Sequence, residues 1–358
     1  MGTKVIAAMS GGVDSSVTAA LMVEAGYDVI AITMRLGTHD TIEIESDKPN
    51  CCSLEGVEDA RRVATQLDIP FYAVNYEETF RQSIVDYFAE EYVSGRTPSP
   101  CVICNQDLKF GKLLELATQL EVDYVATGHY ARIEHDPETG RYILRKGLDS
   151  RKDQSYFLFS LTQAQLRRAL MPLGGYEKDA VREVARKYQL RTAEKPESQE
   201  LCFIADDNYK RFLKDRIPEK IQEGDIVDQE GRVLGEHQGI PFYTVGQRKG
   251  LGISAKTPLY VTELKVRDNT IVVGKNENLL ADTMQVEEVN LMTMDKLPEP
   301  IRAEVKIRYK DTGAPATINP LSDTEVEVKF DQPRRAVTPG QAAVFYDGDI
   351  VVGGGWIK

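Results

Sequence analysis

The feature that most constrains the fold is an alternation of strand and helix patterns along the first two hundred residues of this 358-residue chain. Short apolar runs predict strands at residues 4–9, 28–34, 71–75 and 124–127. Helical spacing predicts helices at residues 16–25, 55–67, 77–94 and 110–120. Such alternation is typical of an α/β domain, a doubly wound and mostly parallel sheet with helices on both faces. Ligands of these sheets bind beyond the carboxyl ends of the strands.

Two further helices are predicted at residues 176–188 and 209–216, and from about residue 224 the pattern becomes short β-branched runs separated by Gly, Pro, Asp and Asn. Strands are predicted at residues 259–266, 271–274, 301–309, 324–330 and 342–346, with a turn at Asp268-Asn269. This pattern predicts antiparallel sheet in both parts, a small central β-rich domain and then an antiparallel β-barrel. A break near residues 280–284 would separate them, so we expect three domains, 1–205, 206–280 and 281–358.

A glycine-rich loop follows the first predicted strand, where Ser10 to Ser15 read Ser-Gly-Gly-Val-Asp-Ser. Its glycines let the backbone approach a phosphate, and N–H groups at the following helix start favour an anion. The loop lacks the lysine of the Gly-x-x-x-x-Gly-Lys-Ser/Thr loop. It resembles the loop of the PP-loop ATP pyrophosphatases, which implies ATP cleavage between the α and β phosphates. Asp14 would either help to hold Mg²⁺ or orient the phosphates.

Two cysteines stand in contexts that suggest thiol chemistry. Cys104 lies where a predicted loop enters a helix, and a thiol near a helix N-terminus has a lowered pKa and is more nucleophilic. Cys202 lies in Ser-Gln-Glu-Leu-Cys-Phe-Ile, residues 198–204. In an ATP-activating enzyme, a thiol suggests sulfur transfer onto an adenylated carbonyl. Two thiols allow a persulfide on one and its resolution through a disulfide with the other.

The remaining three of the five cysteines leave alternatives open. Cys101 precedes Cys104 by three positions and could be another disulfide partner. Together with Cys51 and Cys52, the pair could also form a four-thiolate zinc or iron–sulfur site. Cys51 and Cys52 could each instead be a small buried side chain or have a supporting redox role.

Composition limits the classes of function. Apolar residues make up 42% and charged residues 28% of the chain, as in an ordinary globular protein. The net charge of −12 argues against a generally basic nucleic-acid-binding surface, although residues 141–152 carry five basic residues and one acidic residue. Arg248-Lys249, Arg334-Arg335 and one face of the strand at 301–309 add further basic groups. With no long apolar run and no secretory pattern at the start, we expect a cytoplasmic protein without membrane contact.

Several motifs in order resemble the tRNA-specific 2-thiouridylase family across nearly the whole chain. They are the Ser10 loop, Cys-Asn-x-x-Leu-Lys-Phe from Cys104, Ala-Thr-Gly-His-Tyr at 126–130, Asp-Gln-Ser-Tyr-Phe at 153–157, the Cys202 motif, and Thr-Val-Gly-Gln-Arg-Lys-Gly-Leu-Gly at 244–252. The resemblance implies a PP-loop domain, a small central domain and a C-terminal β-barrel. It also implies a catalytic role for Asp14, Cys104 and Cys202, with the persulfide on Cys202.

The resemblance further implies which residues bind the substrates. The residues expected to bind ATP are Ala8, Met9, Ser10, Gly11, Gly12, Val13, Asp14, Ser15, Met34 and Gly128. Those expected to contact tRNA are His129, Arg151, Lys152, Asp153, Arg308, Tyr309 and Gln341. Mg²⁺ is expected with ATP, a cysteine desulfurase or sulfur-carrier protein as the persulfide donor, and the tRNAs for Lys, Glu and Gln as acceptors. A uridine altered at its ring must leave its stack and enter a pocket.

The implied reaction is adenylation of the wobble uridine 2-oxygen, followed by sulfur transfer from the Cys202 persulfide and departure of AMP. Cys104 would form a disulfide with Cys202 or assist in another way, and a reductant would reset the pair. Two alternatives stay open. Another PP-loop ligase would have no use for Cys202, whereas a metal-stabilised tRNA-binding protein would contain zinc or iron and release no AMP.

Overall fold

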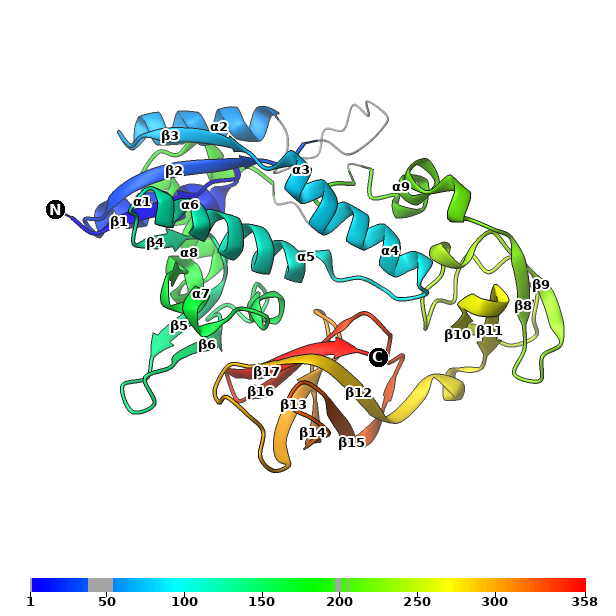
Figure 1. The fold of residues 1–358 in the computed structure, drawn as a ribbon. Helices are drawn as coiled ribbons and strands as arrows, with labels where there is room; N and C mark the ends of the chain where they lie inside the picture. Colours follow the sequence, from blue (N-terminus) through cyan, green and yellow to red (C-terminus); the bar gives the residue numbers. More distant parts are fainter. Residues whose placement is uncertain (1, 38–53, 197–200, 205) are drawn as a thin grey trace. The chain divides into compact units, whose positions relative to one another are not determined.

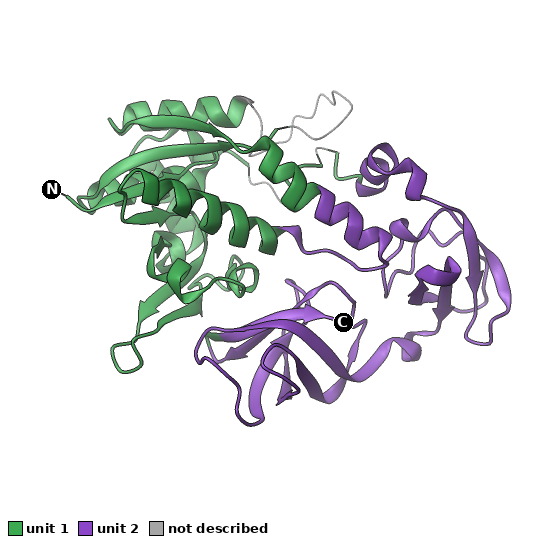
Figure 2. Cartoon of the chain, viewed as in Figure 1, with its two compact units in different colours: residues 1–85, 101–208, 349–351 green, residues 86–100, 209–348, 352–358 purple. Residues whose placement is uncertain are grey.

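The computed structural model describes residues 2–37, 54–196, 201–204 and 206–358. The chain forms two compact units, shown in green and purple in Figure 2. Unit 1 contains residues 1–85, 101–208 and 349–351, and unit 2 contains residues 86–100, 209–348 and 352–358. Each unit therefore includes segments that are distant in the sequence.

Unit 1 is built on the predicted parallel sheet, whose strand order is β3-β2-β1-β4-β7 (Figure 1). The strands are β1 (Lys4–Ala8), β2 (Asp28–Arg35), β3 (Phe71–Asn75), β4 (Tyr124–Ala126) and β7 (Ala169–Leu170). The chain adds β2 and β3 on one side of β1 and then β4 on the other side. The strand order thus reverses between β1 and β4, and such a switch point is where open α/β sheets bind ligands.

Both faces of this sheet are covered, as the alternation of strands and helices predicts. Val5 and Ala7 of β1 share one hydrophobic core with residues of α1 (Val13–Glu24), α2 (Leu54–Gln66) and α8 (Lys178–Lys187). Ile6, which alternation places on the opposite face, is also fully buried. Burial on both faces explains why residues 5–8 of β1 are all apolar and show no polar alternation.

One helix begins much earlier than predicted. The helix expected at residues 110–120 starts at Pro100 and continues through α5 (Pro100–Ile103), a π-helical segment (Cys104–Lys112) and α6 (Leu113–Gln119). Cys, Asn and Asp are weak helix formers, so local propensity at residues 104–107 does not favour a helix. Tertiary contacts outweigh that propensity, because Asn105 is buried and its side-chain amide donates to the Phe157 carbonyl at 3.0 Å.

The remaining elements of unit 1 include a hairpin that the sequence analysis missed. Its strands, β5 (Ala131–His135) and β6 (Tyr142–Lys146), pair antiparallel, and Arg145 also pairs with Ile350. The predicted helix at 77–94 is present as α3 (Glu77–Phe80), a π-helical segment (Arg81–Asp86) and α4 (Tyr87–Val93), and its residues from Asp86 onward belong to unit 2. A short helix, α7 (Gln163–Arg167), has a capping box at Thr162.

Unit 2 contains the two predicted β regions. The first is a four-stranded sheet in the order β10-β11-β8-β9, with β8 (Gly224–Val227), β9 (Val233–His237), β10 (Tyr260–Lys265) and β11 (Thr270–Gly274). The expected turn is present, with Asn269 in the left-handed conformation at φ +46°. The expectation of purely antiparallel pairing is wrong here, because β11 pairs in parallel with β8. The helix α9 (Tyr209–Arg216) has the predicted bounds.

The second β region closes into a barrel in the order β12-β15-β14-β13-β16-β17, with β12 also paired to β17. Its strands are β12 (Leu280–Leu291), β13 (Ile301–Lys306), β14 (Ala314–Pro320), β15 (Val326–Arg335), β16 (Ala342–Asp347) and β17 (Ile350–Ile357). Residues 280–284, where the division between the two β regions is expected, form the start of β12. Strand β13 has the predicted faces, with Val305 fully buried and Arg302 exposed, but it ends three residues early.

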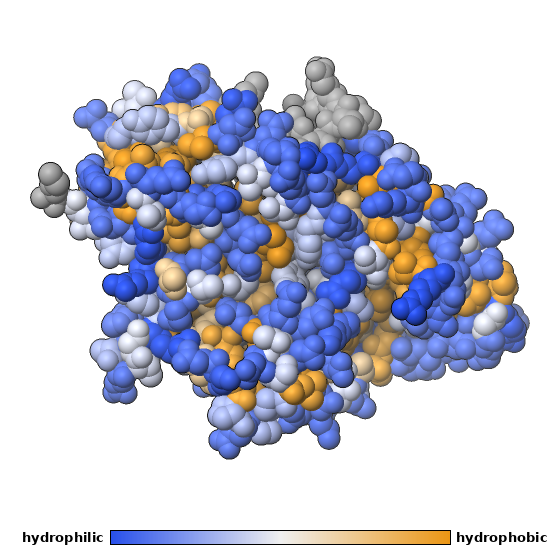
Figure 3. Space-filling view, viewed as in Figure 1, coloured by the Kyte–Doolittle hydropathy of each residue, from blue (hydrophilic) through white to orange (hydrophobic). Residues whose placement is uncertain are grey.

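The surface is mixed in polarity. On the face shown in Figure 3, hydrophilic side chains predominate and hydrophobic residues form scattered patches. Across the residues that the structure describes, no helix has both the length and the apolar character to span a bilayer.

Candidate active site

The loop between β1 and α1 has a backbone that only glycine permits. Gly11 has φ +75°, and a Cβ there would lie 2.2 Å from the Gly56 carbonyl oxygen. Gly12 forms the N-cap of α1 and provides no side-chain cap. The first-turn N–H groups of α1 therefore have no side-chain oxygen from the cap residue, which suits an anionic ligand.

Serine side chains hold this loop in shape. The Ser15 hydroxyl donates to the Gly12 carbonyl at 3.0 Å and accepts from the Ser10 backbone N–H at 3.2 Å. The Ser16 hydroxyl donates to the same Gly12 carbonyl at 2.9 Å, and the Met9 N–H donates to the Ile32 carbonyl at 2.8 Å. These bonds organise the loop before any ligand is present, which lowers the entropic cost of binding.

The end of β4 lies directly against this loop. A Cβ on Gly128 would lie 3.0 Å from the Asp14 carbonyl carbon and 3.1 Å from the Ser15 nitrogen. Gly128 is thus required for close packing of the β4 end against the first turn of α1. The other residues expected to bind ATP are in the same part of unit 1, with Ala8 at the end of β1 and Met34 half-buried near the end of β2.

The Asp14 carboxylate has two partners that the sequence analysis did not predict. The Tyr130 hydroxyl donates to Asp14 Oδ1 at 2.8 Å, and Lys178 Nζ donates to the same oxygen at 2.7 Å. Lys178 Nζ also lies 5.6 Å from the centre of the Tyr130 ring. Tyr130 belongs to the Ala-Thr-Gly-His-Tyr motif, which was a signal for its importance, whereas no local pattern marks Lys178.

A second carboxylate holds the helix that carries Lys178. Asp149 is buried, and its Oδ2 accepts from the Lys178 backbone N–H at 3.1 Å, capping the start of α8. Its Oδ1 accepts from the Arg151 side chain at 3.1 Å and from the Arg151 backbone N–H at 3.0 Å. The side-chain hydrogen bond from Arg151, followed by these backbone N–H groups, lowers the pKa of Asp149 to about 2 against the opposing effect of burial.

These groups fit a bound polyphosphate. The loop presents backbone close to the helix start, and Lys178 adds a buried cation next to Asp14. Among the described residues, no group of three or more His, Cys, Asp or Glu side chains is placed to hold a metal ion.

The three cysteines that the structure describes lie in unit 1, and none of them is part of a disulfide. Cys104 and Cys202 are half-buried and Cys101 is exposed. Because the helix starts at Pro100, Cys101 lies in its first turn and Cys104 lies one turn further along, so the expected location of Cys104 at the helix start is wrong. Cys202 lies in a turn in which the Ile204 N–H donates to the Leu201 carbonyl. Cys51 and Cys52 lie outside the described residues.

His129 is buried and directly follows Gly128. Its Nδ1 is 2.8 Å from the Thr127 hydroxyl, and its ring centre is 6.0 Å from that of Phe110. Burial, followed by repulsion from Lys109, lowers the pKa of His129 well below its ordinary value. The imidazole is therefore neutral at pH 7, and its expected contact with tRNA stays a prediction.

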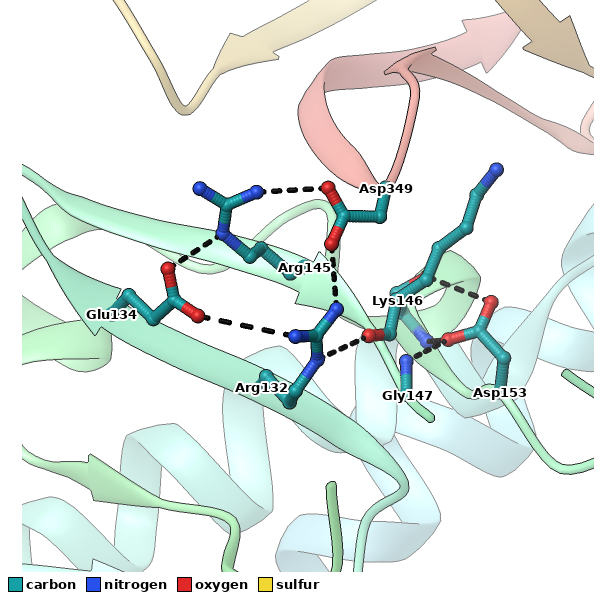
Figure 4. A network of polar contacts seen from close by, with 8 residues as sticks. Arg132, Glu134, Arg145, Lys146, Gly147, Asp153 and Asp349 are labelled. Atoms are coloured by element: carbon teal, nitrogen blue, oxygen red, sulfur yellow. Dashed lines mark hydrogen bonds and ion pairs between the residues drawn. The ribbon is translucent and has the colours of Figure 1, made fainter. Parts of the chain in front are cut away.

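The segment expected to contact tRNA in unit 1 is held by its own carboxylates. Asp153 is buried, and its Oδ1 accepts from the Gly147 backbone N–H at 3.0 Å (Figure 4). The same oxygen accepts from the Ser155 backbone N–H at 3.1 Å. Lys152 is half-buried, whereas the side chain of Arg151 is 68% exposed. Arg151 is thus the member of this segment that is most open to a ligand, while Asp153 shapes the loop.

In unit 2, the expected tRNA residues have different surroundings. Arg308 is exposed and Tyr309 is half-buried, just after the end of β13. The Gln341 side-chain amide donates to the Thr97 and Pro98 carbonyls at 3.0 and 3.2 Å, so it holds the segment that leads to α5.

Several of the basic residues noted in the sequence already have acidic partners. Arg145 bonds Glu134 at 2.7 Å and Asp349 at 2.8 Å, in the network of Figure 4. Arg302 bonds Asp331, and Arg334 pairs with the buried Asp311. The positive charge available to a ligand is therefore smaller than the sequence suggests.

Three models of known protein families match consecutive parts of the chain. Residues 3–206 match a tRNA methyl transferase HUP domain, residues 210–275 a tRNA methyl transferase PRC-barrel domain, and residues 281–357 an aminomethyltransferase beta-barrel domain. These matches agree with the predicted fold class of a parallel-sheet domain followed by two β regions.

Similar proteins align over the whole chain. The tRNA-specific 2-thiouridylase MnmA of Carboxydothermus hydrogenoformans is 49% identical over 99% of this chain and 97% of that protein. The protein of the same name from Clostridioides difficile is 49% identical over 100% of this chain and 99% of that protein. The one from Clostridium acetobutylicum is 48% identical over the full length of both chains. The chain therefore belongs to the family of the tRNA-specific 2-thiouridylases.

Proposed function

We propose that this protein is a tRNA-uridine 2-sulfurtransferase that converts the wobble uridine of tRNA to 2-thiouridine with ATP. The observation that carries the proposal is the organised loop of residues 10–15 at the β1–β4 switch point, in a chain with full-length 2-thiouridylase relatives. The proposed site around it consists of Ala8 to Ser15, Met34 and Gly128 for ATP, with Asp14 oriented by Tyr130 and Lys178.

The proposed reaction has two stages. The uridine 2-oxygen attacks the α-phosphate of ATP and displaces pyrophosphate, which makes the adjacent carbon electrophilic. The terminal sulfur of a Cys202 persulfide then attacks that carbon, and AMP leaves with the former 2-oxygen. The Cys104 thiolate breaks the sulfur–sulfur bond by forming a disulfide with Cys202, and an external thiol reductant restores both thiols. Both cysteines are half-buried thiols of unit 1, which supports this use.

The finer assignments follow from the same proposal. The substrates are ATP with Mg²⁺ and the tRNAs for Lys, Glu and Gln, and a cysteine desulfurase or sulfur-carrier protein supplies the persulfide in the cytoplasm. His129, Arg151 to Asp153, Arg308, Tyr309 and Gln341 act in tRNA binding. Three functional domains, 1–205, 206–280 and 281–358, are supported by the separate family matches to residues 3–206, 210–275 and 281–357.

The test incubates the purified chain with ATP-Mg, an unmodified glutamate tRNA transcript and a persulfide donor. AMP and 2-thiouridine are quantified by mass spectrometry for the wild type, Cys104→Ser and Cys202→Ser. We expect both substitutions to abolish thiolation, because each removes a thiol that the sulfur transfer requires. Cys101→Ser is the matched control, since this exposed cysteine lies in the same helix as Cys104 and should keep wild-type turnover.

Two results would overturn the proposal. Full turnover in Cys202→Ser would favour another PP-loop ligase, which activates a carboxylate and needs no thiol. Stoichiometric zinc or iron in the purified chain, without AMP release, would favour a metal-stabilised tRNA-binding protein.

A further inference from the structure

The glycine-rich loop of residues 10–15 contains no lysine, but Lys178 of the distant helix α8 lies beside it. Residues 10–15 contain no basic side chain. Lys178, 164 positions after Asp14, brings its ammonium group to 2.7 Å from Asp14 Oδ1. Asp14 is in the first turn of α1, where the N–H groups favour an anion. The tertiary fold thus puts a cation beside a loop that has no basic side chain of its own.

Three contacts hold Lys178 in this position. Its side chain is only 6% exposed, and it lies over the Tyr130 ring with the Tyr130 hydroxyl on the same Asp14 oxygen. Its backbone N–H is bound by Asp149, which fixes the start of α8. A lysine side chain loses considerable conformational freedom when it is ordered, so an ordered and buried ammonium is already prepared for binding.

The charges around Lys178 also favour a role toward phosphate. Asp14 Oδ1 accepts from both Tyr130 and Lys178, so the carboxylate keeps the ammonium next to the helix start. The leaving pyrophosphate of an adenylation carries several negative charges that need positive partners. The Asp14 carboxylate by itself would repel those negative charges. The Lys178 ammonium group, which contacts Asp14, provides a positive charge at the same place.

We propose that Lys178 binds the β- and γ-phosphates of ATP and stabilises the departing pyrophosphate. It would thereby take the role that the lysine of the Gly-x-x-x-x-Gly-Lys-Ser/Thr loop has toward these phosphates. This inference rests on the proposed function, because it requires ATP at residues 10–15. Asp14 and Tyr130 are positioning residues in this arrangement, since they hold the ammonium group.

The test measures ligand binding by calorimetry, separately from turnover, with ATP-Mg, pyrophosphate and AMP as probes. Lys178→Met should weaken ATP and pyrophosphate about 10- to 100-fold, the range for losing a hydrogen bond between charged groups. AMP binding should change less than about twofold, because AMP lacks the β- and γ-phosphates. Lys178→Arg should recover part of the pyrophosphate affinity, because it restores a cation.

Lys187→Met is the matched control. Lys187 is at the other end of α8, is 64% exposed and pairs with Glu24. Its removal should leave all three affinities unchanged. Equal weakening of AMP and ATP in Lys178→Met would overturn the proposal, because it would point to distortion of the whole site.

A purely neutralising role for Lys178 is tested by combining Lys178→Met with Asp14→Asn. If Lys178 only balances the Asp14 charge, the double variant should bind pyrophosphate as tightly as Asp14→Asn alone. If Lys178 binds phosphate, the double variant should bind it about tenfold or more weakly than Asp14→Asn. Wild-type protein that binds neither ATP nor pyrophosphate would overturn the proposed function as well, whereas wild-type binding with unaffected Lys178 variants would overturn this inference alone.

Discussion

Unit 1 and unit 2 each contain an ion pair of similar length in very different surroundings. In unit 1, Lys178 Nζ is 2.7 Å from Asp14, and the two side chains are 6% and 31% exposed. In unit 2, Arg302 on strand β13 bonds Asp331 at 2.7 Å, and the two side chains are 57% and 43% exposed. Distance therefore does not distinguish the two pairs, but burial does.

The difference in burial indicates which of the two ion pairs is suited to a functional site. Water screens the Arg302–Asp331 pair, so its contribution to stability is small and its arginine is readily released to another partner. In the Lys178–Asp14 pair the lysine side chain is buried, so removing one charge leaves the other without its partner in a region poor in water. The first arrangement suits a surface that exchanges partners, and the second suits a site that must keep its geometry.

The largest expected effect tests this comparison directly. Lys178→Met should lower the free energy of unfolding by about 2–3 kcal/mol, less than for a fully buried pair because Asp14 retains some contact with water. Arg302→Met should produce no measurable change. Denaturant unfolding of both variants checks this prediction, and equal losses would show that burial does not separate the two pairs.

A smaller effect is expected from packing at the same edge of unit 1. Gly128→Ala should cost about 1–3 kcal/mol, because the added Cβ would lie 3.0 Å from the Asp14 backbone. Gly175→Ala is the control, since a Cβ there meets no atom within 4 Å. Thermal unfolding of the two variants gives the comparison. A wild-type melting temperature for Gly128→Ala would mean that β4 and α1 pack less closely than described.

The smallest expected effect is a pH dependence that differs between the units. Burial lowers the pKa of His129 far below 6.5, so below pH 6.5 the unfolded chain takes up a proton that the folded chain does not. The resulting stability is complete above pH 6.5 and is lost as the pH falls. In unit 2, burial also lowers the pKa of His237, but a hydrogen bond to the Asn269 carbonyl opposes that change.

The slope of unfolding free energy against pH, measured between pH 7.5 and 5.5, distinguishes the two histidines. His129→Gln should flatten this slope more than His237→Gln. The slope is independent of any constant loss of stability that the substitutions cause. A larger flattening in His237→Gln would place the stronger desolvation in unit 2.

The predictions from sequence succeeded where local pattern and burial agree. Apolar β1 and the glycine-rich loop after it were identified correctly, as was the change to β structure in the second part of the chain. The helix at Pro100 was missed because Asn105 is helical through burial and a bond to Phe157, which no local propensity reports. The parallel pairing of β11 with β8 was missed because strand runs do not specify their partners.

The candidate site divides in the same way. The sequence by itself determined the strand–loop–helix unit at residues 4–24, because glycine conformation and helix capping depend on neighbouring residues. It also determined which thiols are present. Only the tertiary structure brought Tyr130 and Lys178, 116 and 164 positions away, onto Asp14. Contacts between residues so far apart depend on strand order and helix packing, which no short window of sequence contains.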